Sequence, residues 1–253
     1  MDKITIIIFT HNEEKNIEDC INSAKLLTTQ ILIIDMESSD KSLATAKKMK
    51  VRVINHPFSH YVEPARQFGI EKASTDWVFV LDADERITQD LAQEIKQAIK
   101  NGKKLSYYKI ARKNCFFSHW LKHGGWWPDY QIRLINKSYF ISWPKEIHST
   151  PKVRGTYGYL KYPLVHNFHG DLQTMVDKTI VFEDIESNLL FRAGRSATTV
   201  IFFRKFLGET WRRLAKRMGF LDGTVGIIEG IYQAFSKTIT YLFLYEKSSS
   251  RSV

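Results

Sequence analysis

Short apolar runs alternate with segments of helical spacing over the first hundred residues. The runs are five to eight residues long and rich in Ile, Val and Phe, which is typical of strands buried on both faces. Strands are predicted over 3–10, 30–36, 51–55 and 77–82. Helices are predicted over 16–27, 42–50, 62–73 and 87–102, the second capped by Ser39 or Asp40 and the fourth starting at Thr88 and ending at Gly102. This alternation indicates an α/β fold with a mostly parallel sheet flanked by helices.

The pattern changes twice further along the chain. From about residue 106 it becomes irregular and aromatic, and from about residue 171 it is helical. We therefore predict an α/β half over 1–105, a second half of the same domain over 106–170 and a helical C-terminal appendage over 171–253.

The helical segment carries most of the chain's excess positive charge of +10. Eight Lys and Arg residues and a single acid, Glu209, lie between Arg192 and Gly219. Six apolar residues recur there at helical spacing, opposite most of the cations: Val200, Phe203, Leu207, Trp211, Leu214 and Met218. Two interpretations stand: a helix packed on the catalytic domain with a solvated basic side, or a helix lying on an anionic membrane surface. The apolar stretch 227–246 is interpreted as a packed or interfacial helix, or as a contact in a homo-oligomer.

Composition excludes several classes of protein. With 253 residues and 43% hydrophobic content, the chain buries a sizeable core, so disorder is excluded. Cys20 and Cys115 form no CxxC motif, which argues against a disulfide framework or a zinc site. The N-terminus lacks the pattern of a signal peptide, and no apolar stretch reaches the length of a membrane span. A cytoplasmic protein is expected.

Polar residues follow the predicted strands where each strand ends. Thr10, Asp35, Asp82 and Asp84 should converge on one rim, because ligands of such sheets sit beyond the carboxyl ends of the strands. Asp82 and Asp84 are two apart, so both carboxylates can reach one divalent cation, Mg²⁺ or Mn²⁺. No GxxxxGK or GxGxxG loop is present, so metal and basic side chains must hold any phosphate.

Several motifs together resemble the inverting glycosyltransferases of family 2, which have the GT-A fold. They are FTHNEEKNI, IIDMESSDKS, EPARQFGIEKA and DWVFVLDADE. The later HGGWWPDYQIRL, EIH, LVHN and GFLDG are similar to lipopolysaccharide-core β-1,4-glucosyltransferases that act on inner-core heptose. The resemblance implies a UDP-sugar donor, a divalent metal, a lipid-anchored saccharide acceptor and a peripheral location at the cytoplasmic face of the inner membrane.

The resemblance also implies residue roles. Thr10, Asn12 and Glu14 match the loop that holds the nucleoside, Asp35 the acid that binds uracil, and Arg66 a basic residue at the base or diphosphate. Asp82 and Asp84 match the metal-binding DxD motif, with Asp84 as the direct ligand.

The remaining roles rest on local context. Asp129 is the candidate general base, since it follows the aromatic loop in which Trp126 and Trp127 could meet an acceptor sugar. His148 and His166 are candidates for a third metal ligand or for diphosphate binding. Relatives have His-Glu where this chain has His148 followed by Ser149, which removes one rival carboxylate and leaves Glu146 nearby.

Three other functions were weighed against glycosyl transfer. A nucleotidyltransferase would ordinarily have a phosphate loop rich in Gly and Lys near the N-terminus, and none is present. A nucleic-acid-binding module is disfavoured because the basic residues lie away from the aromatic loop and the strand ends are acidic. A catalytically silent relative at the membrane surface stays open, and turnover would distinguish it.

Overall fold

A computed structural model describes residues 3–100, 105–168 and 172–249. The chain forms two compact units: residues 1–113 with 129–166, and residues 114–128 with 167–253. The division differs from the predicted one because residues 114–128 belong with the C-terminal helices rather than with the α/β domain. The predicted boundary at residue 170 lies outside the described residues.

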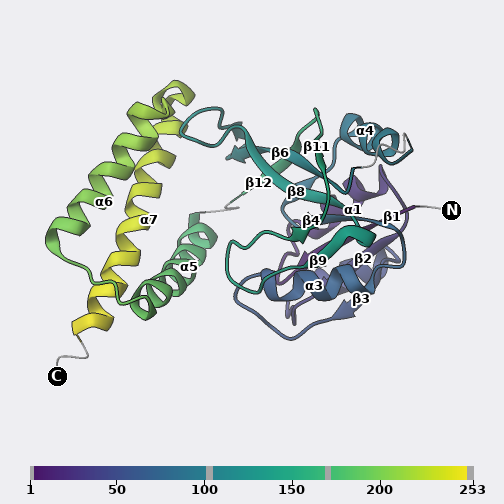
Figure 1. The fold of residues 1–253 in the computed structure, drawn as a ribbon, viewed down its shortest axis with the longest axis horizontal. Helices are drawn as coiled ribbons and strands as arrows, with labels where there is room; N and C mark the ends of the chain where they lie inside the picture. The colour runs from purple at the N-terminus through teal and green to yellow at the C-terminus, as the bar shows by residue number, and fades with distance from the viewer. Residues whose placement is uncertain (1–2, 101–104, 169–171, 250–253) are drawn as a thin grey trace. The chain divides into compact units, whose positions relative to one another are not determined.

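The sheet of the first unit begins with four parallel strands (Figure 1). They are β1 (Ile4–Thr10), β2 (Ile31–Asp35), β3 (Arg52–Asn55) and β4 (Trp77–Asp82), in the order β3-β2-β1-β4. Each was predicted from its apolar run, and the α/β fold class is confirmed. The carboxyl ends of β1, β2 and β4 meet at one edge, where Thr10 pairs with Asp35 and Phe9 with Asp82.

The helices between these strands also match the predicted pattern. They are α1 (Ile17–Lys25), α2 (Ser42–Lys48), α3 (Glu63–Lys72) and α4 (Gln89–Lys100). The predicted cap of α4 is present, since Thr88 Oγ1 accepts a hydrogen bond from the Leu91 N–H at 3.2 Å. The N-cap of α2 is Lys41 rather than Ser39 or Asp40, although Asp40 Oδ1 accepts a hydrogen bond from the Ser42 N–H at 2.9 Å. The predicted end of α4 at Gly102 lies outside the described residues.

The parallel strands are buried on both faces, as their unbroken apolar runs require. Ile6 and Ile8 of β1 pack on α1, α2 and α4, whereas Ile7 and Phe9 pack on α3. The helices therefore cover both faces of the sheet and leave its edge at the strand ends for the site.

The irregular region beyond residue 105 forms further strands rather than loops. They are β6 (Tyr107–Phe116), β7 (His119–Trp120), β8 (Asp129–Asn136), β9 (Phe140–Ser142), β10 (Lys152–Val153), β11 (Tyr157–Tyr159) and β12 (Leu164–Asn167), with a short 3-10 turn at Lys137–Tyr139. A short strand, β5 (Glu85–Arg86), lies earlier in the chain, between β4 and α4. Strand β8 pairs antiparallel with both β4 and β6, and β12 pairs antiparallel with β5. These pairings bring residues 112, 129, 133 and 166 to the sheet that carries Asp82.

The second unit is mainly helical. It contains α5 (Leu172–Arg192), α6 (Thr199–Trp211), a π-helical turn (Arg212–Lys216), a 3-10 turn (Gly219–Asp222) and α7 (Gly223–Ser249). Helix α7 packs against both α5 and α6. Phe116 and Leu121 from the 114–128 segment share a small core with Phe168 and Met175. Within the described ranges, no helix is both long and apolar enough to span a membrane.

Candidate active site

The β1 loop and the loop after β2 are tied together by polar side chains. Asn12, with a left-handed φ of 54°, accepts a hydrogen bond from the Ser39 N–H at 2.8 Å through Oδ1. Glu14 Oε2 accepts one from the Lys41 N–H at 3.1 Å, and the Glu14 N–H donates to Asp40 Oδ2 at 2.9 Å. Asn12 and Glu14, which were predicted to hold a nucleoside, thus shape the loop where that nucleoside would lie.

Asp35 presents a buried acceptor at the end of β2. Its side chain is 1% exposed, and Oδ2 accepts a hydrogen bond from the Ser38 N–H at 3.0 Å. Asp35 Oδ1 and Thr10 Oγ1, on neighbouring strands, have no hydrogen-bond partner among the described residues. Leaving a buried polar atom unpaired costs about 1–3 kcal/mol. This edge of the sheet is therefore suited to a ligand that donates hydrogen bonds.

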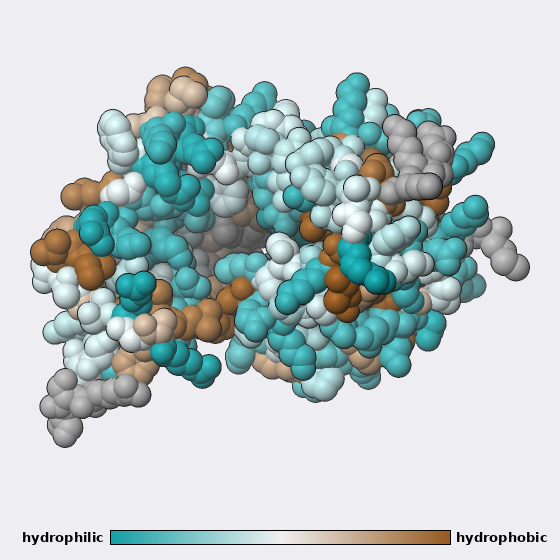
Figure 2. All heavy atoms as spheres, viewed as in Figure 1, coloured by the Kyte–Doolittle hydropathy of each residue, from teal (hydrophilic) through white to brown (hydrophobic). Residues whose placement is uncertain are grey.

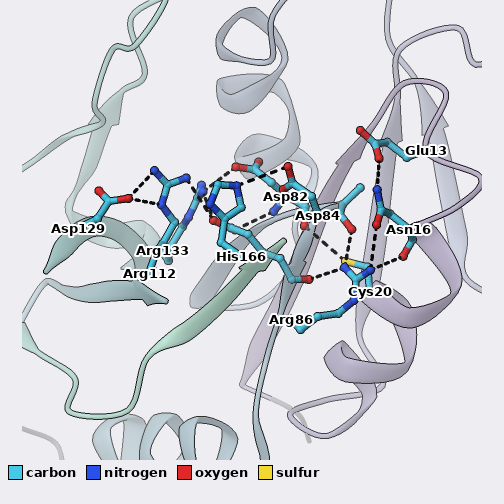
Figure 3. Close-up of polar contacts among 12 residues, drawn as sticks. Glu13, Asn16, Cys20, Asp82, Asp84, Arg86, Arg112, Asp129, Arg133 and His166 are labelled. Atoms are coloured by element: carbon cyan, nitrogen blue, oxygen red, sulfur yellow. Dashed lines mark hydrogen bonds and ion pairs between the residues drawn. The ribbon is translucent and has the colours of Figure 1, made fainter. Parts of the chain in front are cut away.

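Asp82 lies between two buried arginines (Figure 3). Nη2 of Arg66, on α3, is 2.9 Å from Asp82 Oδ1, and Nη2 of Arg133, on β8, is 2.6 Å from Asp82 Oδ2. The Arg66 guanidinium is also held between the rings of Phe9 and Trp143, while its Nη1 has no hydrogen-bond partner among the described residues. One buried cationic donor thus stays available to an anion.

Glu85 belongs to the same group of charged side chains as Asp82, Arg66 and Arg133. It is fully buried, its Oε1 lies 2.5 Å from Arg133 Nη2, and its Oε2 accepts a hydrogen bond from the Asp82 N–H at 3.0 Å. Burial opposes ionisation of Asp82, but the charges of Arg133 and Arg66 prevail and hold its pKa below the usual range. Burial, reinforced by the charge of Asp82, instead raises the pKa of Glu85. Burial alone would lower the pKa of Arg133, but the two carboxylates raise it above its ordinary value.

Asp84 has a different partner from Asp82. Strand β4 ends at Asp82 and the chain turns at residues 83–84, so the alternation expected of a continuous strand is interrupted. Asp84 Oδ2 lies 3.5 Å from Nε2 of His166, on β12, because β12 pairs with β5 in the register His166–Glu85. The structure therefore brings Asp84 and His166 together, as predicted for metal ligands, whereas Asp82 is engaged by arginines.

Asp84 and His166 could hold a divalent metal only together with ligands from a bound substrate. Among the described residues, no three His, Cys, Asp or Glu side chains gather into a ready-made metal centre, so the predicted trio of Asp82, Asp84 and His166 is not one. Mg²⁺ sites that include substrate phosphates need only one or two protein carboxylates, the rest being phosphate oxygens and water. Asp84 with His166 meets that requirement.

Asp129 is held at the start of β8 by an arginine. Its Oδ2 accepts hydrogen bonds from Arg112 Nε at 2.8 Å and pairs with Arg112 Nη2 at 2.7 Å, and its Oδ1 accepts one from Gln131 Nε2 at 2.8 Å. Arg112 Nη1 also lies 3.8 Å from Glu85 Oε1. Arg112 therefore connects Asp129, the candidate base, to the ion pairs around Asp82 and Glu85. Arg112 and Gln131 thus fix the orientation of the carboxylate.

His148 lies on an exposed turn with a left-handed φ of 60°. Its N–H donates to Oε1 of Glu63, at the start of α3, at 3.0 Å. The contact places the turn beside the helix that carries Arg66, but no metal-ligand group forms around His148 within the described residues.

The two predicted acceptor-side tryptophans belong to the second unit. Trp126 packs on Phe168 with ring centroids 4.8 Å apart, and the Arg213 guanidinium lies 4.9 Å from its centroid. Trp127 meets Trp120 edge-on at 5.2 Å. Trp126 is thus part of the packing of the helical unit, whereas Trp127 forms a half-exposed aromatic pair.

Sequence reasoning missed Arg133, Arg112 and the site role of Glu85. A signal was present for Arg133, since it is the only charged residue within the apolar run IRLI of β8. A charge buried in a strand requires a partner, but its partner lies 51 residues earlier and only the β4–β8 register identifies it.

The sheet and its helices have the arrangement of the GT-A fold. The family model described as glycosyl transferase family 2 matches residues 5–151, more than half of the chain. The chain therefore belongs to glycosyl transferase family 2. The matched region contains the site residues Arg66, Asp82, Asp84, Glu85, Arg112, Asp129 and Arg133, whereas His166 lies beyond it.

Individual relatives extend the likeness beyond that region. An uncharacterized glycosyltransferase of Rickettsia typhi is 27% identical over 274 residues, covering 100% of this chain and 90% of the relative. The lipopolysaccharide core biosynthesis glycosyltransferase LpsC of Rhizobium meliloti is 26% identical over 115 residues, 44% of this chain and 42% of that protein. The crystal structure of S. aureus TarS 1–349 in complex with UDP superposes with a TM-score of 0.51 at 14% identity, covering 98% and 91% of the two chains. That last likeness shows the fold alone.

Proposed function

We propose that this enzyme transfers a hexose, with glucose as the first candidate, from a UDP-sugar to a lipopolysaccharide-core or related glycolipid acceptor, with inversion at the anomeric carbon. The observation that carries the proposal is the meeting of an unpaired acceptor, a buried cationic donor and the Asp84–His166 pair at one sheet edge. Family membership supports sugar transfer, and the likeness to LpsC supports the acceptor class.

Asp35 would bind the nucleobase. The uracil ring offers an N–H donor, and Asp35 Oδ1 is a buried acceptor that has no partner within the described part of the chain. Thr10, Asn12 and Glu14 would line the same nucleoside pocket, the last two through the loops that they tie together.

The diphosphate would lie between Arg66 and Asp84. Nη1 of Arg66 offers a free donor to a phosphate oxygen, while Asp84 and His166 would hold Mg²⁺ or Mn²⁺. Such a metal supplies charge neutralisation for the departing diphosphate when it is bound. Arg133 neutralises Asp82 and Glu85, so the acids near the diphosphate do not repel it.

Asp129 would act as the general base, with His148 as a candidate for diphosphate contact. The Asp129 carboxylate takes the proton of the acceptor hydroxyl, the acceptor oxygen forms its bond to the anomeric carbon, and the bond from that carbon to the diphosphate oxygen breaks. UDP leaves with the electron pair of the broken bond. Arg112 orients Asp129 throughout.

The test is transfer by the purified full chain from several UDP-hexoses to a truncated inner-core lipooligosaccharide, followed as UDP release and a gain of one hexose in acceptor mass. Asp84→Asn is expected to lower turnover about 100-fold or more, whereas Asp90→Asn, an exposed acid in the first turn of α4, is the matched control. Absence of UDP binding in calorimetry, with or without Mn²⁺, would overturn the donor assignment. UDP binding without transfer to any saccharide would identify a catalytically silent relative instead.

A further inference from the structure

The helical unit buries several polar side chains and exposes many large apolar ones. Its buried polar residues include Ser187, Glu229, Ser236, Thr238 and Thr240, each at most 8% exposed, beside buried apolar residues such as Met175, Ala234 and Leu244. Its exposed apolar residues include Phe203, Leu207, Trp211, Ile228, Ile231, Phe235 and Leu242, each at least 47% exposed. Exposed apolar side chains in such number mark a surface that contacts a partner or a membrane.

Polar contacts join the helices of the unit. Ser236 Oγ of α7 donates to Glu183 Oε1 of α5 at 2.5 Å, and Thr240 hydrogen-bonds the same carboxylate. Thr179 and Tyr232 hydrogen-bond at 2.8 Å, also between α5 and α7. In an apolar medium helices associate through such hydrogen bonds, because burial of apolar side chains between them gains little there.

Helix α7 approaches the two turns that precede it, Arg212–Lys216 and Gly219–Asp222, closely through glycines. A Cβ at Gly230 would lie 2.5 Å from Leu214 Cδ2, and one at Gly226 would lie 2.1 Å from the carbonyl oxygen of Gly219. Larger residues are thereby kept off the contact face and remain on the outside.

The exposed apolar residues form a stripe on each helix. Val200, Phe203, Leu207 and Trp211 recur at helical spacing along α6, and Val200 and Trp211 are 74% and 67% exposed. Figure 2 shows hydrophobic side chains at the surface over α6 among hydrophilic ones.

Exposed cations lie along the same segment as the α6 stripe. Arg204, Lys205, Arg212, Lys216 and Arg217 are exposed, whereas Glu209, the one acid of this segment, is paired with Arg212 and Arg213. An isologous contact between two copies through this surface would bring the same cations together, and like charges repel. Anionic lipid headgroups are complementary to the cations, and acyl chains to the apolar residues.

We propose that the α6–α7 hairpin inserts its apolar side chains into the headgroup and acyl boundary of an anionic bilayer without crossing it, with Trp211, Phe203 and Leu207 as anchors. The inference concerns binding to lipid and stands whether or not the proposed transfer reaction holds.

The test is co-sedimentation of the full chain with vesicles of equal parts phosphatidylcholine and phosphatidylglycerol, and with phosphatidylcholine alone. We expect binding to the anionic vesicles, and an affinity about tenfold or more lower for Phe203→Ser/Leu207→Ser. The matched control, Leu26→Ser/Ile141→Ser, removes two exposed apolar side chains from the first unit and should bind as wild type does. Equal binding by the Phe203/Leu207 variant, or no vesicle binding by wild type, would overturn the proposal.

A second measurement reports insertion directly. Phospholipids brominated near the glycerol end of the acyl chain should quench tryptophan fluorescence of the wild type, and Trp211→Phe, which leaves five of the six tryptophans, should lose most of that quenching. Unchanged quenching in Trp211→Phe would overturn the role of Trp211 as an anchor. Concentration-dependent dimerisation that the Phe203/Leu207 substitutions abolish, with vesicle binding intact, would assign the surface to a second copy instead.

Discussion

Nη2 of Arg133 lies 2.6 Å from Oδ2 of Asp82, and the same nitrogen contacts Glu85 at 2.5 Å. One arginine on β8 thus contacts two acids, Asp82 at the end of β4 and Glu85 on β5, and the antiparallel pairing of β8 with β4 brings it to them. The pairing connects stability to the site, because removing this guanidinium leaves two buried or half-buried carboxylates without their shared counter-charge.

Arg133→Gln is therefore expected to lower the free energy of unfolding by about 3 kcal/mol, the usual cost of removing one partner of a buried ion pair. Urea unfolding followed by circular dichroism measures the change. Arg52→Gln, at an exposed position on β3, is the control and should stay within about 0.5 kcal/mol of wild type. A loss no larger than that of the control would show that Glu85 is already neutral and that the pair is dispensable.

The depressed pKa of Asp82 predicts an acid-dependent term in stability. A carboxyl whose pKa is lower in the folded than in the unfolded chain contributes stability above its ordinary pKa of about 3.9 and loses it as the pH falls further. The stability difference between wild type and Asp82→Asn should be largest near neutral pH and shrink below about pH 4, each unit of depression being worth about 1.4 kcal/mol. Urea unfolding of both proteins at several pH values tests this, and a constant difference would contradict it. Glu85, whose pKa is raised by burial and by the charge of Asp82, acts with the opposite sign. Because Asp82→Asn removes that charge, the Glu85 contribution does not cancel and reduces the difference between the two proteins.

Asp35→Asn should weaken UDP binding about tenfold or more. The asparagine oxygen can still accept the hydrogen bond from the Ser38 N–H, so the NH₂ group takes the position of the unpaired Oδ1. That NH₂ group would then face the N–H donor of the uracil ring, and two donors cannot form a hydrogen bond. Calorimetric titration with UDP measures the affinity, and Asp90→Asn again serves as the control. Unchanged affinity would remove Asp35 from the nucleobase site.

Asp129→Asn should lower kcat by about 100-fold or more while UDP affinity changes less than about twofold, because a general base acts on the acceptor proton and not on the nucleotide. Steady-state kinetics and calorimetry together separate the two effects. Glu146→Gln, which neutralises the exposed carboxylate two residues before His148, should leave kcat unchanged. The reverse result for the two variants would move the base to Glu146.

Gly69→Ala should destabilise the protein by about 1–3 kcal/mol. A Cβ at Gly69, on α3, would lie 2.8 Å from Cζ of Phe9 and 2.9 Å from Cγ2 of Ile7, so β1 and α3 would have to separate. Gly208→Ala is the matched control, since nothing lies within 4 Å of that position on α6 and alanine favours a helix by about 1 kcal/mol. Thermal unfolding of the two variants should therefore shift in opposite directions, and stabilisation by both would contradict the close packing at Gly69.

The parallel half of the fold was readable from the sequence because local periodicity determines it. Unbroken runs such as ITIIIFT admit only a strand buried on both faces, and polar residues at their ends then fall on one edge. The acid cluster was also visible, since Asp82, Asp84 and Glu85 follow such a run directly.

The counter-charges of those acids were not readable, because they are contributed by distant strands. Arg133 meets Glu85 across 48 residues and only through the register that sets Phe79 opposite Leu134. Nor did periodicity decide which surface of α6 faces outward: an apolar stripe has the same spacing whether it is covered by protein or exposed. Burial decided it.

The division of the chain into two interleaved units bears on how the protein is dissected in the laboratory. A chain shortened after residue 166 would keep Phe116, Leu121 and Trp126 but lose Phe168 and Met175, against which they pack. Three large apolar side chains would become exposed to solvent in the shortened chain, and exposed apolar surfaces of this kind promote aggregation. An insoluble truncation would therefore say nothing about lipid binding or sugar transfer, and point substitutions in the whole chain are the means of separating the two.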